Sequence, residues 1–172
     1  MKRKSIEKHK INYVELEIGD IVLYKGNGFF SKLVRFFTKS EYSHVSMMLS
    51  DKLSIEANWY KKSNVVPIKY DKDTMEFYRV KGGLTDKQKL VLLQHSYNFL
   101  NKVYDYPQIF GYVIRFFDKS KINLFNSTKR LICSELIDRA YLKLGIDLSS
   151  ENYIGDVTPK DIANSDKLTR IL

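Results

Sequence analysis

The chain is short of several features that would assign it to a class of protein. Its 172 residues contain a single cysteine, Cys133, which excludes an internal disulfide and a cysteine-based zinc cluster. No apolar run approaches the roughly 18 residues of a membrane span, and residues 1–10 lack the apolar stretch of a secretory signal. Internal repeats and linkers rich in glycine, serine or proline are also missing. We therefore expect one cytoplasmic domain over residues 1–172, with residues 1–17 as a polar lead-in.

The composition is that of a globular protein with a basic surface. Hydrophobic residues make up 44% and charged residues 28% of the chain, and the formal net charge is +9. A charge of this sign can attract nucleic acid, anionic lipid or an acidic polymer. The lysines are spread along the whole chain, however, and only residues 2–4 form a compact basic cluster. We expect a solvated basic surface, open to an anionic partner, and no specific nucleic-acid site.

Hydrophobic periodicity predicts strands in the first half of the chain with helices before and after them. The expected strands cover residues 19–24, 44–49, 54–60, 65–69 and 75–80, of which the last four form a meander. The expected helices cover residues 29–37, 85–100 and 131–144, and Gly145 closes the last one. Residues 104–117 are ambiguous, with a helix after Pro107, and a polar loop follows. This grouping indicates an α+β fold.

The last predicted helix places Cys133 in its first turn. Unpaired N–H groups and the positive end of the helix dipole favour a thiolate at this position, and the same groups can bind an oxyanion beside the sulfur. A lone cysteine is otherwise a small core hydrophobe, so the position favours a nucleophile and leaves the structural role open. The apolar face of this helix comprises Leu136, Ile137, Ala140, Tyr141 and Leu144, and the opposite face comprises Ser134, Glu135, Asp138, Arg139 and Lys143.

A thiolate nucleophile needs a base, and His44 is the histidine best placed to be one. It begins an expected strand, where the ring is held rigidly while its tip stays accessible. His9 lies in the basic lead-in and His95 near the edge of the buried face of a helix, so a solvated or structural role suits them better. A structural role is the alternative for His44 as well.

The base in turn needs an acceptor for its second ring nitrogen. Glu56 and Asn58 share one face of the strand predicted at residues 54–60, because alternate residues of a strand point the same way. If the connecting turn has an odd number of residues, that face is also the face of His44. Glu56 is then a neighbour, directly or diagonally across the pair. Asn58 competes for the same role on register, and an exposed strand carboxylate is the alternative for Glu56.

Four segments together resemble the YiiX-like, circularly permuted branch of the NlpC-type papain-like cysteine hydrolases. They are GDIVL at 19–23, SEYSHVSM at 40–47, IEA at 55–57 and ICSEL at 132–136. In that family the strands that carry the histidine and the glutamate precede the helix that carries the cysteine, which is the order found here. The resemblance covers roughly residues 18–160.

The resemblance implies a permuted papain-like fold, in which an antiparallel strand meander packs against helices. It implies that Cys133 attacks a carbonyl carbon, that His44 relays the proton and that Glu56 orients His44, with the Cys133 N–H holding the oxyanion. Family members are amidases, peptidases or acyl hydrolases, so we expect a thiol hydrolase acting on an amide or ester of a small peptide-like or acyl substrate. We expect no cofactor and no metal. The implied substrate-binding residues are Tyr104, Asp105, Tyr106 and Ser134, and the alternative for the first three is aromatic core with a surface aspartate.

Two other functions fit parts of the sequence. One is a non-catalytic binding module on the same fold, which holds a ligand through its pocket and basic surface. The presence of both Cys133 and His44 argues against it, because a scaffold needs neither. The other is a binder of nucleic acid or anionic membrane, which only the charge suggests. Steep salt dependence of binding without hydrolysis would mark that one.

Overall fold

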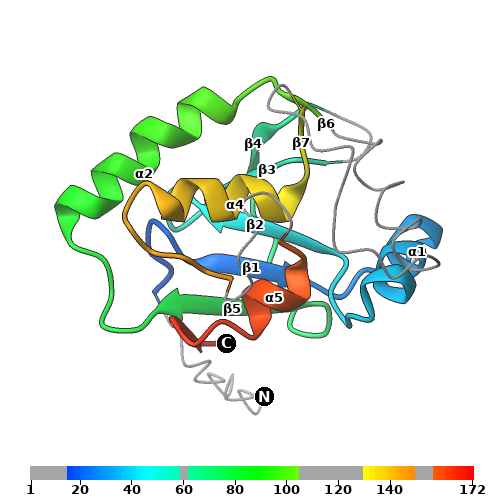
Figure 1. Ribbon diagram of the computed structural model, residues 1–172. Coiled ribbons are helices and arrows are strands. Elements are labelled where there is room, and N and C mark those ends of the chain that lie inside the picture. Colours follow the sequence, from blue (N-terminus) through cyan, green and yellow to red (C-terminus); the bar gives the residue numbers. More distant parts are fainter. Residues whose placement is uncertain (1–14, 59–61, 105–129, 150–156) are drawn as a thin grey trace, which may run out of the picture.

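A computed structural model describes residues 15–58, 62–104, 130–149 and 157–172. Its main element is a six-stranded antiparallel sheet in the order β4-β3-β2-β1-β5-β8, with helices against it (Figure 1). The strands of this sheet are β1 (Ile21–Tyr24), β2 (His44–Met48), β3 (Leu53–Glu56), β4 (Asn64–Pro67), β5 (Met75–Val80) and β8 (Leu168–Arg170). The helices are α1 (Phe29–Thr38), α2 (Asp86–Phe99), α4 (Cys133–Leu142) and α5 (Pro159–Ala163), and β6 (Val103–Tyr104) pairs with β7 (Arg130–Leu131) in a small parallel sheet.

The α+β prediction is confirmed, and each strand and helix predicted within the described residues has a counterpart in the same part of the chain. The pairing differs from a simple meander, because β5 returns to pair with β1 on the side away from β2. The helix predicted from residue 131 begins at Cys133 instead, since β7 takes residues 130–131 and Ile132 is extended, with φ −97° and ψ 164°. The helix predicted after Pro107 and the loop at 118–129 lie outside the described residues.

The sheet is buried on both faces in its central strands. Alternate residues of β1 and β2 face α4, and the residues between them face a second, smaller apolar cluster on the other side. This two-sided burial explains why β1 is an unbroken apolar run rather than an alternating one. The larger core includes Ile21, Leu23, Val45, Met47 and Ile55 of the sheet with Leu136, Ile137, Ala140 and Tyr141 of α4, and the smaller one includes Val22, Met48 and Phe77.

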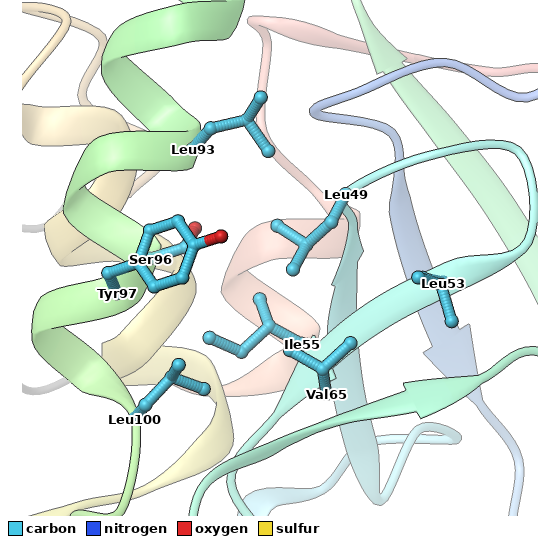
Figure 2. A pocket seen from close by; sticks show the side chains of 8 residues that line it. All are labelled: Leu49, Leu53, Ile55, Val65, Leu93, Ser96, Tyr97 and Leu100. Carbon is cyan, nitrogen blue, oxygen red and sulfur yellow. The ribbon is translucent and has the colours of Figure 1, made fainter.

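An apolar hollow lies between the sheet and α2 (Figure 2). Leu49, Ile55 and Val65 line it from the sheet side, and Leu93 and Leu100 from the side of α2. It holds about 230 Å³ and none of the three residues expected to be catalytic lines it. Leu49 and Leu100 pack against the larger core, so the hollow continues the contact between α2 and the sheet.

The first part of helix α4 is buried on its polar face as well as on its apolar face. Ser134, Glu135 and Asp138 are each at most 1% exposed. The Ser134 hydroxyl donates a hydrogen bond to the backbone carbonyl of Val157 at 2.5 Å, so the segment that leads into α5 covers this side. The Glu135 carboxylate forms an ion pair with Arg139, one turn further along the helix. The start of α4 is therefore held from both sides, which fixes the position of the residue at its first turn.

None of the helices within the described residues combines the length and the apolar character that a membrane span requires.

Candidate active site

The register of β2 and β3 brings Glu56 to His44. The ladder pairs Met47 with Ile55 and Met48 with Ser54. Continued to the start of β2, the same register sets Asn58 opposite His44 and makes Glu56 its diagonal neighbour, on the same face of the sheet. Glu56 Oε2 lies 2.9 Å from His44 Nε2. Of the two arrangements that the sequence leaves open, direct or diagonal, the diagonal one is found.

Asn58 contacts the glutamate rather than competing with it for the imidazole. Its side-chain Nδ2 donates a hydrogen bond to Glu56 Oε1 at 3.1 Å. The two carboxylate oxygens of Glu56 thus have different partners, His44 on one oxygen and Asn58 on the other. This arrangement fixes the plane of the carboxylate and therefore its angle to the imidazole ring.

Cys133 completes a hydrogen-bonded chain with His44 and Glu56. It is the first residue of α4 and is 5% exposed. Its side chain is hydrogen-bonded to the His44 ring and accepts hydrogen bonds from the backbone N–H groups of Val45 and Ser134. Because Nε2 of His44 contacts Glu56, Nδ1 is the ring nitrogen available to the sulfur. The geometry brings the predicted nucleophile, base and orienting group together, and their catalytic roles stay a prediction.

The surroundings of Cys133 and His44 favour the charged form of both. Burial raises the pKa of the Cys133 thiol, but the charge and hydrogen bond of His44 and the two backbone N–H groups outweigh it and hold that pKa below its ordinary value. Burial likewise lowers the pKa of His44, but the charges and hydrogen bonds of Cys133 and Glu56 raise it to about 10. Both shifts therefore favour a thiolate beside an imidazolium, and the two groups titrate as a coupled unit.

Tyr24 packs against the imidazole from the neighbouring strand. It is paired with His44 in the β1–β2 ladder, and the two rings lie 5.2 Å apart at their centroids with an angle of 41° between their planes. Its hydroxyl is 2.9 Å from Ser46 Oγ, and burial raises the pKa of Tyr24 to about 12, so it stays neutral. Tyr24 is not among the residues predicted for the site, because nothing in a strand sequence tells which residue will stand opposite the histidine.

The predicted substrate-binding residues fall in different places. Tyr104 lies in β6, where it pairs with Leu131, just before the start of α4. Asp105 and Tyr106 lie outside the described residues. The side chain of Ser134 belongs to the buried face of α4, while its backbone N–H contacts the Cys133 sulfur. Contact of these residues with a substrate stays a prediction.

Comparison with known proteins finds a family model and a solved structure that match the chain. A family model described as "Permuted papain-like amidase enzyme, YaeF/YiiX, C92 family" matches residues 15–171. The chain belongs to this family. No curated protein matches it significantly. Among solved structures, the crystal structure of metalloprotein yiiX from Escherichia coli O157:H7 is similar, with a TM-score of 0.70 and 22% identity over 92% of this chain and 97% of that one.

The YaeF/YiiX membership confirms the family and the permuted papain-like fold that the sequence predicts. The yiiX protein is described as a metalloprotein. In the described part of the present chain, no group of three or more histidine, cysteine, aspartate or glutamate side chains could hold a metal ion. Cys133, His44 and Glu56 are instead arranged as hydrogen-bond partners of one another. These residues do not fit a metal site, so no step of the chemistry is assigned to a metal.

Proposed function

We propose that this chain is a cysteine amidase with Cys133 as nucleophile, His44 as base and Glu56 as the group that orients and stabilises His44. The observation that carries the proposal is the hydrogen-bonded chain from Cys133 through His44 to Glu56 at the start of α4. The amidase description of the family supports the type of bond that is cleaved. The substrate class within that type, peptide-like or acyl amide, or the related ester, is part of the proposal.

The reaction begins with attack of the Cys133 thiolate on the carbonyl carbon of the substrate. A carbon–sulfur bond forms, and the carbonyl electron pair moves onto the oxygen. The backbone N–H of Cys133 belongs to the first turn of α4, whose N–H groups have no acceptor within the helix, so it can donate to this oxyanion. The burial of the site strengthens that hydrogen bond, because little solvent competes for it.

His44 then moves the proton that the leaving group needs. As the tetrahedral intermediate collapses, the imidazolium donates its proton to the leaving amine and the carbon–nitrogen bond breaks, which leaves a thioester on Cys133. A water molecule attacks the thioester while neutral His44 takes its proton. Collapse of the second intermediate releases the carboxylic acid and restores the thiolate and imidazolium. Glu56 stabilises the imidazolium in each state where it is present, and Asn58 acts as a positioning residue through the carboxylate.

The experiment that tests this function is a search for the covalent intermediate. The full chain is incubated with a series of p-nitroanilide and ester probes that carry peptide-like or fatty-acyl groups, and intact-mass and peptide spectrometry locate the acyl group. We expect a thioester on Cys133, its loss in Cys133→Ala and its near loss in His44→Ala. His95→Ala, a histidine on α2, is the matched control and should retain full labelling. Hydrolysis that persists in folded Cys133→Ala would overturn the proposal.

A further inference from the structure

Helix α1 presents an apolar stripe to solvent. Phe29 is 85% exposed, Phe36 is 64% exposed and Leu33 is 37% exposed. They occur at positions i, i+4 and i+7, which lie on one side of a helix. The ring of Phe36 also contacts Phe37 edge-on, at 5.3 Å between centroids. Two large aromatic side chains this exposed on one short helix are the kind of surface that marks an interaction site.

Every charged residue of the same helix is basic. Lys32 and Arg35 lie within α1 and Lys39 caps it, and no aspartate or glutamate occurs in residues 29–39. At 100° per residue, Lys32 falls beside the apolar stripe and Arg35 further round on the same flank. The next acidic residue along the chain, Glu41, has its charge engaged by Lys25 at 2.7 Å. An apolar stripe flanked by cations is the pattern of a helix that lies in a membrane interface.

Helix α1 lies at the end of the sheet where β2 begins with His44. It connects the end of β1 to the start of β2, and the two residues at those ends, Tyr24 and His44, are paired in the ladder. Figure 1 shows α1 at one end of the molecule and α2 away from it, with the start of α4 toward the α1 end. A surface that α1 contacts would therefore lie near the end of the sheet that holds His44, the partner of Cys133.

We propose that α1 is an interfacial anchor that docks this end of the protein onto an anionic phospholipid surface. Phe29, Leu33 and Phe36 enter the boundary between headgroups and acyl chains, and the exposed Lys32 beside them meets the phosphates of the headgroups. The positive charges beside the apolar stripe complement an anionic lipid surface, and this favours a membrane over the other partners. A second copy of the chain would bring the same cations face to face, and a nucleic acid would leave the apolar stripe in water.

The docking explains how substrate could reach the protein, and this consequence rests on the proposed function. With α1 in the interface, an amide or ester whose acyl part is anchored in the bilayer would be presented next to Cys133. The docking itself does not depend on catalysis, because it is carried by the exposed residues of α1 alone.

The test is flotation of the full chain with vesicles of phosphatidylcholine, with and without phosphatidylglycerol, at low and high salt. We expect binding to the vesicles that contain phosphatidylglycerol and its loss at high salt. Phe29→Ser should weaken binding by at least about tenfold, and Lys32→Gln by about fivefold. Leu90→Ser and Lys87→Gln on α2 are the matched controls, each an exposed residue of similar type, and should leave binding unchanged.

Several results would overturn the docking surface. These are no binding of the folded wild-type chain, equal losses in the α1 and α2 variants, or a concentration-dependent dimer that Phe29→Ser dissociates. Circular dichroism of each variant checks that it is folded. If the protein binds vesicles through α1 but shows no hydrolytic activity, the membrane anchor is supported and the proposed function is contradicted. Hydrolysis of a soluble probe should be equal in wild type and Phe29→Ser.

Discussion

Glu56→Gln replaces the carboxylate that contacts His44 with an amide of nearly the same shape. The contact is 2.9 Å long and joins Glu56 Oε2 to His44 Nε2, while Asn58 holds the other oxygen at 3.1 Å. With glutamine in place, one of the two positions becomes an NH₂ group. If that NH₂ group faces His44, Nε2 must accept its hydrogen bond, and the proton of the neutral ring moves to Nδ1. Nδ1 is then already protonated and cannot take the proton of Cys133. If the oxygen faces His44 instead, the ring keeps its tautomer but loses the neighbouring negative charge.

The magnitude follows from the loss of a charge-assisted hydrogen bond to a buried ring. Such a bond contributes about 1.5–3 kcal/mol, which is one to two units of the His44 pKa at about 1.4 kcal/mol per unit. The loss of the carboxylate alone should therefore slow turnover by roughly ten- to a hundredfold, and a change of tautomer would bring the loss to about ten-thousandfold, as in triads of this kind. We expect the direction to be a lower pKa for His44, because one of the groups that raise it has gone.

The assay is turnover of the best probe by Glu56→Gln and Asn58→Ala, with the His44 pKa read by NMR. Asn58→Ala leaves the contact of Glu56 with His44 in place and removes only a donor that positions the carboxylate, so only part of the energy of that bond should appear in the rate, about two- to tenfold. Thermal unfolding of both variants checks that the domain is intact. Full activity of Glu56→Gln together with an inactive Asn58→Ala would refute the assignment, since the amide would then be the orienting group.

Three further substitutions test the fold around the site. Burial, with the charge of Asp147, raises the pKa of Asp138 to about 6, so its folded form binds a proton more tightly than its unfolded form and stability falls as pH rises from about 4 to 6. Asp138→Asn should thus stabilise the protein by about 3 kcal/mol near neutral pH and little at about pH 4, measured by urea unfolding. Gly19→Ala, at φ +90° with a new Cβ 2.5 Å from Leu84 Cδ1, should lower stability by about 1–3 kcal/mol. Leu136→Ala, fully buried beside the sheet, should lower it by about 2–5 kcal/mol.

Two of these substitutions have an internal control. An effect of Asp138→Asn that is the same at both pH values would show that its ionisation is not the cause. Gly82 also has a positive φ, of +81°, but a Cβ added there would meet no atom within 4 Å. Gly82→Ala should therefore lose only the stability that the positive φ costs. If it destabilises the protein as much as Gly19→Ala does, the contact of a Cβ at position 19 with Leu84 is not a cause of the loss.

The sequence predicts the elements of the site better than their connections. Cys133 is indicated by its place at the start of an amphipathic helix and His44 by its place at the start of a strand, and both signals are local. Glu56 follows from strand parity, but its diagonal contact depends on a register that only the folded β2–β3 ladder defines. The link from Asn58 to Glu56 and the packing of Tyr24 on His44 are likewise contacts between side chains that no local pattern encodes.

The parts of the fold that the sequence did not predict are either short elements or surfaces that are buried by segments distant in the sequence. β8 and α5 are too short to show a hydrophobic period. For α5 a local signal exists, since Thr158 and Asp161 form a capping box around Pro159. The first part of the polar face of α4 is buried where Ser134 contacts the segment at Val157. In α1 the spacing predicts a helix, but it does not tell that Leu33 belongs to an exposed stripe.

The rate of alkylation of Cys133 as a function of pH tests the central claim most directly. The chain has one cysteine, so iodoacetamide reports on this thiol alone. A thiolate held by His44 and by backbone N–H groups should react well below about pH 8.5, the ordinary pKa of a free cysteine, and His44→Ala should move the profile to higher pH. A profile centred near about 8.5 in the folded protein, unchanged by His44→Ala, would contradict an activated Cys133–His44 pair.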